Sequence, residues 1–135
     1  MKWARSLIRI SNHEVETVQK RVAEIVERRI GIEMQMAALE AELTAERAGA
    51  ARIEAAGLYL AGFVEGVRIR KAALEEQLAV IAVEESGARD ALAEAFEALK
   101  KYEHVLEAAR AADAKERDRR ETAEMDEVGL RMVSK

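Results

Sequence analysis

The first long heptad pattern of the chain decides the fold. Residues 18–53 read VQKRVAEIVERRIGIEMQMAALEAELTAERAGAARI. Apolar side chains recur there at alternating steps of four and three, interrupted by Arg29 and Glu46. This spacing is typical of the seam of a coiled coil. The predicted seam positions are Val18, Val22, Ile25, Arg29, Ile32, Met36, Leu39, Leu43, Glu46, Ala50 and Ile53.

A second seam follows further along the chain, interrupted by Arg70 and Glu85. Between the two seams stand Gly57, Gly62 and Gly66, and glycine is costly inside a helix. We therefore predict a chain reversal at about 57–62. The positions of the second seam are Phe63, Val67, Leu74, Leu78, Ile81, Ala88, Leu92, Ala95, Leu99, Tyr102, Leu106 and Ala109.

Two helical seams joined by one short turn predict an all-α fold, a long antiparallel two-helix coiled-coil hairpin. We expect one domain over 1–135, with arms at about 3–56 and 63–128 and an overhang at 116–135. In this register Gly31 would face Gly87, which favours close approach of the arms. One continuous helix in a homodimeric scaffold or tether is the alternative.

The composition excludes several classes of protein. The chain has 135 residues, a net charge of −4, no Pro and no Cys. Without cysteine there is no disulfide scaffold, zinc–thiolate site or cysteine nucleophile. A two-helix rod also offers no water-excluding pocket in which to tune a carboxylate. We therefore expect no enzyme, no catalytic residue, no metal and no cofactor. The mildly acidic charge argues against a nucleic-acid partner.

The first residues form a short basic amphipathic segment. Lys2, Arg5 and Arg9 alternate with apolar side chains over residues 1–10. Such a segment can lie on an anionic membrane. We favour the simpler interpretation, in which Trp3, Leu7 and Ile10 begin the seam and join it through a stutter at Glu14. No signal peptide or membrane span is evident, so we expect a cytoplasmic protein.

Two further stretches stand out. Most residues between 110 and 127 are charged, and the seam positions there are charged as well. Such a segment is either a solvated helix end or a partner-binding helix. At the other end, Tyr59, Leu60 and Phe63 form an apolar cluster, with Val67 one helical turn further on. They either continue the core or dock a partner.

These two stretches resemble the flagellar FliJ family. Residues 116–127 read ERDRRETAEMDE and are followed by Arg131, as in the charged C-terminal helix of that family. Tyr59, Phe63 and Val67 are similar to the aromatic and apolar residues that follow its helical turn. The chain length and the two-helix layout fit as well. Stalk proteins of virulence-type secretion systems share that layout and remain an alternative.

The resemblance implies a stalk in type III protein export, peripheral at the inner membrane. Proteins of this kind insert into the ring of the flagellar export ATPase and contact the cytoplasmic domain of the export gate and export chaperones. Phe63, with Tyr59 and Val67, would then face the gate or chaperones. The residues implied to face the ATPase are Arg117, Arg119, Arg120, Glu124, Asp126 and Glu127.

Overall fold

Two long helices make up nearly all of the fold. A computed structural model describes residues 2–134. Helix α1 spans Lys2–Ala50, a short 3-10 helix η1 spans Glu54–Ala56, and α2 spans Gly57–Val133. No strand occurs in this part of the chain. The all-α prediction is therefore confirmed, and a proline-free chain rich in Ala, Glu, Leu and Arg accounts for it.

The chain reverses earlier than the glycines suggest. The last turn of α1 closes with the Ala51 N–H donating to the Arg47 carbonyl at 3.1 Å. Ile53 then leaves the helix with φ −128° and ψ 114°. The turn thus lies at 51–56, not at 57–62 as the sequence predicts. Gly57, Gly62 and Gly66 are all helical, and no described residue has a positive φ. An ordinary extended residue makes this turn, so it needs no glycine.

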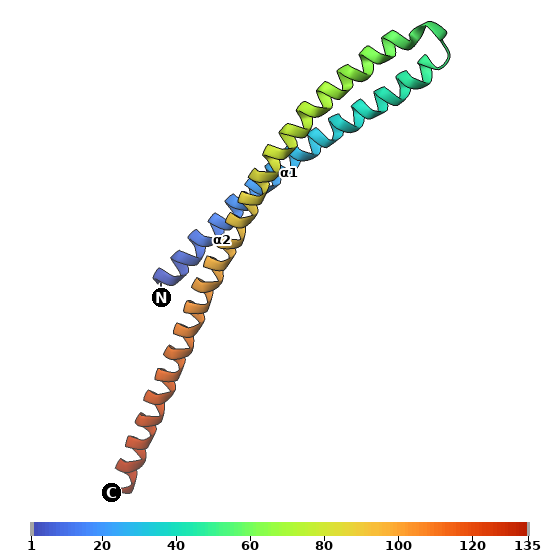
Figure 1. Cartoon of the computed structure of the whole chain (residues 1–135). Coiled ribbons are helices and arrows are strands. Elements are labelled where there is room, and N and C mark those ends of the chain that lie inside the picture. The colour runs from blue at the N-terminus through green and yellow to red at the C-terminus, as the bar shows by residue number, and fades with distance from the viewer. Residues whose placement is uncertain (1, 135) are drawn as a thin grey trace. The chain divides into compact units, whose positions relative to one another are not determined.

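The chain divides into two compact units, of which residues 17–92 form one. Within it α1 and α2 run antiparallel side by side (Figure 1). One core cluster contains Val22, Ile25, Ile81 and Ala88, with Val26, Ile32 and Leu92 packed against it. A second contains Leu39, Val67 and Leu74, with Ile32, Met36, Leu43 and Phe63 packed against it. Ile32 therefore links the two clusters.

Burial follows both predicted seams in this unit. From Val18 to Ala50, every predicted position is buried or partly buried. Ile53 is the exception: it lies in the turn and is 61% exposed. On α2, Arg70 is exposed and the partly buried Lys71 occupies the seam instead. The Lys71 ammonium donates to Glu40 at 2.9 Å, which raises the pKa of the lysine.

The charged interruptions of the two seams meet each other. Arg29 Nε donates to Glu85 Oε1 at 2.9 Å, and Arg29 Nη1 reaches Glu33 at 3.1 Å. Arg89 Nε donates to the other Glu85 oxygen at 3.3 Å. The hydrogen bond from Arg29 is the main reason that the pKa of Glu85 lies below its ordinary value, and Arg89 acts in the same direction. Arg29 and Glu85, which interrupt the two apolar seams, thus form one polar layer between the helices.

The observed register places the glycines apart. Arg28 pairs with Glu84, Arg29 with Glu85 and Glu40 with Lys71. Gly31 consequently borders the same groove as Val80 and Ile81 rather than Gly87. The predicted Gly31–Gly87 contact is wrong because the turn begins several residues earlier than expected, which shifts every pairing.

Residues 2–16 and 93–134 belong to the second unit. Its buried residues on α1 are Ala4, Ser11 and Val15, and those on α2 are Ala95 and Leu106. With the partly buried Ile8, the α1 positions 4, 8, 11, 15 and 18 follow each other by steps of four and three. The predicted stutter at Glu14 is therefore wrong. Trp3 and Ile10, two of the residues predicted to begin the seam, are 58% and 66% exposed.

The described residues contain no helix long and apolar enough to cross a membrane.

Candidate partner-binding surfaces

The end of α2 forms a helix without tertiary packing. Leu106 is its last buried residue, and Ala109 and Glu116 are partly buried. Every residue from 117 to 134 is exposed. We call this segment, residues 117–134, the tail. Its charged side chains cannot form a seam, so the helix continues without a neighbour there.

The six tail residues that the sequence singles out are all exposed on this helix. Arg119 and Arg120 are bound to Glu116, at 2.9 and 3.6 Å. Glu127 accepts a hydrogen bond from Arg131 at 3.1 Å. Such surface pairs contribute little to stability. The other three, Arg117, Glu124 and Asp126, make no ion pair within residues 2–134.

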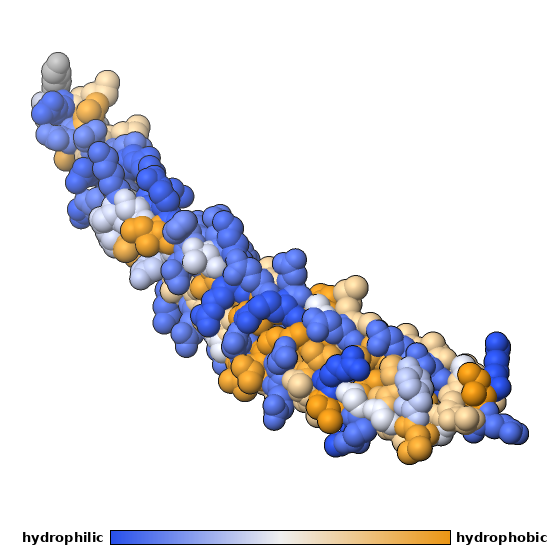
Figure 2. Space-filling model, turned by 90° about the horizontal axis from the view of Figure 1, so that it is seen from above, coloured by the Kyte–Doolittle hydropathy of each residue, from blue (hydrophilic) through white to orange (hydrophobic). Residues whose placement is uncertain are grey.

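The tail also carries an apolar stripe that the sequence reasoning missed. Met125, Val128 and Met132 are 75%, 54% and 76% exposed, and they follow one another by steps of three and four. That spacing places them on one face of the helix. Figure 2 shows a mostly hydrophilic surface along the tail, with apolar side chains near its end. The seam register runs along a different face, which hid the stripe.

Near the turn, the three predicted docking residues have different environments. Tyr59 is 61% exposed, and its ring centroid lies 6.3 Å from that of Phe63. Phe63 is partly buried and packs against the core cluster of Leu39, Val67 and Leu74. Val67 is 3% exposed, so its side chain belongs to the core and not to a docking surface. It faces α1 because it occupies a seam position.

The exposed apolar side chains at the turn include two that were not predicted as site residues. Leu58 is 91% exposed and Ile53 is 61% exposed. We call Ile53, Leu58 and Tyr59 the tip patch. The sequence signal for it was present, because an apolar residue beside a turn has no opposing helix to cover it. Assigning Ile53 to the seam concealed it.

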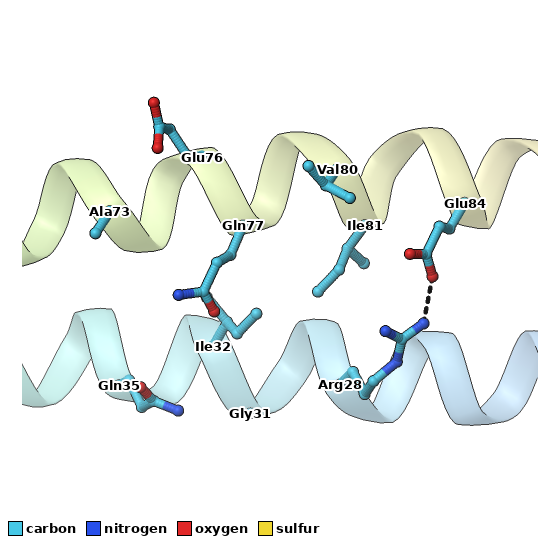
Figure 3. A pocket seen from close by; sticks show the side chains of 10 residues that line it. All are labelled: Arg28, Gly31, Ile32, Gln35, Ala73, Glu76, Gln77, Val80, Ile81 and Glu84. Atoms are coloured by element: carbon cyan, nitrogen blue, oxygen red, sulfur yellow. Dashed lines mark hydrogen bonds and ion pairs between the residues drawn. The ribbon is translucent and has the colours of Figure 1, made fainter.

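A shallow groove runs between α1 and α2 in the unit of residues 17–92. It has a volume of about 630 Å³, and Gly31 and Ala73 leave room along its walls. Figure 3 shows that the guanidinium of Arg28 and the carboxylate of Glu84 close one end as an ion pair, while Glu76 points away. A second groove of about 370 Å³ shares Gln35 and Ala73 with the first.

The groove offers binding area but no reactive group. Arg28 and Glu84 are bound to each other, and the remaining lining side chains are apolar, amide or a carboxylate directed to solvent. Across residues 2–134, no three His, Cys, Asp or Glu side chains are grouped so that they could hold a metal ion. The exposed apolar side chains of the tail and of the tip patch offer area for contact with other macromolecules.

Comparison with known proteins finds relatives that match nearly the whole chain. The flagellar FliJ protein of Caulobacter vibrioides is 54% identical over 133 residues, which cover 98% of this chain and 96% of the relative. The sequence from a second strain of that organism matches to the same extent. No family model matches the chain. No solved structure matches it either.

Proposed function

Because the chain belongs to the flagellar FliJ family, we propose that it serves flagellar protein export as a non-enzymatic stalk. The tail inserts into the ring of the export ATPase and promotes its assembly and activity. The tip patch contacts the cytoplasmic domain of the export gate or the export chaperones. The chain is then cytoplasmic and reaches the inner membrane export apparatus through these partners.

One observation carries this proposal: α2 continues as a helix exposed on all sides beyond its last packed residue. A helix in a ring's pore needs contacts around its whole circumference. The tail offers the charged residues Arg117, Glu124 and Asp126, none of them bound to another described side chain. Its apolar stripe of Met125, Val128 and Met132 adds contact area, and methionine adapts to irregular surfaces.

The stalk would act by differential binding. Its contacts are stronger with the assembled ring than with separate ATPase subunits, so binding shifts the population toward the ring. A ligand can shift such an equilibrium only by its difference in affinity between the two states. The chain therefore needs no chemistry of its own to raise the rate of ATP hydrolysis.

The test is ATP hydrolysis by the purified flagellar export ATPase of the same organism, with and without the chain. Charge reversal of the three tail arginines, Arg117→Glu, Arg119→Glu and Arg120→Glu, should abolish stimulation. These side chains are exposed, so helicity measured by circular dichroism should remain. Stimulation that survives the reversal would exclude the tail arginines as the contact.

A matched control carries the same change of charge elsewhere. Arg47, Arg52 and Arg68 are also exposed, and they lie close to the turn. Their combined replacement by Glu should leave stimulation intact. If both triple variants lose stimulation equally, net charge alone is responsible and the assignment of the tail fails.

The tip patch has its own test. Leu58→Ser and Tyr59→Ser should weaken binding to the isolated gate domain or to export chaperones while leaving ATPase stimulation unchanged. Both side chains are exposed, so the core is retained. Phe63→Ala is less informative, because Phe63 also packs on the core. Unchanged binding to both partners would remove the tip patch from the proposal.

Light scattering in the same experiments separates the stalk from a scaffold. A monomer that stimulates hydrolysis supports the stalk. A stable dimer without effect on the ATPase would instead assign the chain as a homodimeric coiled-coil tether.

A further inference from the structure

The first turns of α1 carry large apolar side chains that the core does not use. Trp3 and Ile10 are 58% and 66% exposed, whereas Ala4 and Ser11 beside them are buried. Trp3 and Ile10 are seven residues apart and therefore share one helix face. The partly buried Leu7 lies between them. An exposed apolar strip thus runs beside the packed face of this segment.

The charges of the same segment are all of one sign. Lys2, Arg5 and Arg9 are exposed, and the first acidic residue of the chain is Glu14. None of the three cations forms an ion pair within residues 2–134. No acidic residue stands in the first turn of α1. Lys2 and Arg5 stand in the first turn of α1, where cations oppose the helix dipole, so these two do not serve the stability of α1.

We propose that this surface binds an anionic membrane directly. The Trp3 patch comprises Trp3, Leu7 and Ile10 with Lys2, Arg5 and Arg9. An indole ring suits the level of the lipid headgroups, because it has an apolar body and one N–H donor. The cations are attracted to anionic lipids, and the small apolar area permits only shallow, reversible insertion. This contact goes beyond the proposed function, in which the chain reaches the membrane only through partners.

The experiment uses the fluorescence of the full-length chain. Trp3 is its single tryptophan, so the emission reports on the Trp3 patch alone. Vesicles of equal parts phosphatidylglycerol and phosphatidylcholine should shift the emission to the blue and carry the chain down on sedimentation. Pure phosphatidylcholine vesicles should do neither, and added salt should release the chain. Absence of both effects with the anionic vesicles would overturn the proposal.

Variants assign the binding to the patch. Arg9→Gln should weaken binding to the anionic vesicles roughly fivefold, the effect expected of one cation near such a surface. Ile10→Ser should reduce both the blue shift and sedimentation. Both side chains are exposed, so the helix content should not change.

The matched control is Val83→Ser. Val83 is 75% exposed, and no lysine or arginine stands within five residues of it along the chain. Its replacement should leave vesicle binding unchanged. A loss of binding equal to that of Ile10→Ser would mean that the chain adsorbs through nonspecific hydrophobic contacts. A blue shift caused by the purified export ATPase but not by vesicles would make the patch a protein contact and overturn the membrane proposal.

Discussion

Arg29 and Glu85 interrupt the two seams, and they are bonded to each other across the hairpin at 2.9 Å. Their side chains are 33% and 19% exposed. A polar pair at one layer of an otherwise apolar seam penalises every register in which either member faces an apolar residue. The pair therefore supports specificity of pairing more than stability.

Replacing both members by leucine should separate these two effects. Arg29→Leu with Glu85→Leu should raise the melting temperature by a few degrees, because an apolar layer replaces a charged one. In the same variant, α1 and α2 should pair in more than one register, and the chain should begin to self-associate, which light scattering would detect. Each single replacement should be less stable than the double one. A double variant that stays monomeric and equally well ordered would show that the pair does not select the register.

Acid should weaken the hairpin through the same layer. The pKa of Glu85 lies below its ordinary value of 4.5, chiefly because of Arg29. A lowered pKa in the folded state means that the stabilisation is complete above 4.5 and is lost as the pH falls through the folded value. Urea unfolding over this range should show the loss. Glu85→Gln should flatten the profile, and an unaltered profile would assign the acid sensitivity to other carboxylates, such as Glu65 beside Arg68.

Alanine should stabilise the helix at two glycines. Gly62 and Gly87 lie inside α2 without a positive φ, and a Cβ added at either would meet no atom within 4 Å beyond its chain neighbours and the adjacent helix backbone. Each replacement should add about 0.5–1 kcal/mol to the free energy of unfolding, because glycine loses more backbone entropy than alanine on folding. Urea denaturation measures this. A decrease for Gly62→Ala would favour the turn at 57–62 that the glycine spacing predicts.

Alanine replacements on α2 should lower the free energy of unfolding in proportion to the burial of the side chain that is removed. Ile81 is 5% exposed and packs with Ile25, so Ile81→Ala should cost about 2–4 kcal/mol of unfolding free energy. Val83, two residues away and 75% exposed, provides the comparison. Val83→Ala should change stability by less than about 0.5 kcal/mol. Equal losses at the two sites would contradict the assigned seam.

The apolar stripe of the tail should matter for partners and not for folding. Met125→Ser with Met132→Ser removes two exposed side chains from one helix face. Thermal unfolding of the isolated chain should be unchanged, because neither side chain packs against the core. Stimulation of the export ATPase should fall severalfold if the stripe contacts the ring. Full stimulation would limit the proposed contact to the charged residues.

The sequence predicted most of the packing because large apolar residues mark most seam positions. It failed where small residues do so: Ala4 and Ser11 are buried, while the larger Trp3 and Ile10 beside them are exposed. Periodicity read from large side chains therefore assigned the wrong face of α1 at its start. The expectation that the glycines mark the chain reversal placed the turn too late. Ile53 reverses the chain with an ordinary extended backbone and needs no glycine.

The candidate surfaces were predictable to a smaller extent. Composition alone marks the charged tail, and all six of its predicted residues are exposed. For Val67 the seam spacing predicts a core position, and only the family resemblance implies a docking role. The structure confirms the seam position, because Val67 is 3% exposed, whereas Leu58 beside the turn is 91% exposed.

The continuity of α2 has a consequence for how the tail stays helical. Starting a helix in water is about a thousandfold less favourable than extending one, because the first turn orders several residues for a single hydrogen bond. The tail avoids this nucleation step, since it only propagates a helix that is already held by packing further back along α2. A synthetic peptide of residues 117–134 should therefore be largely coil, although residues 117–133 are helical in the chain.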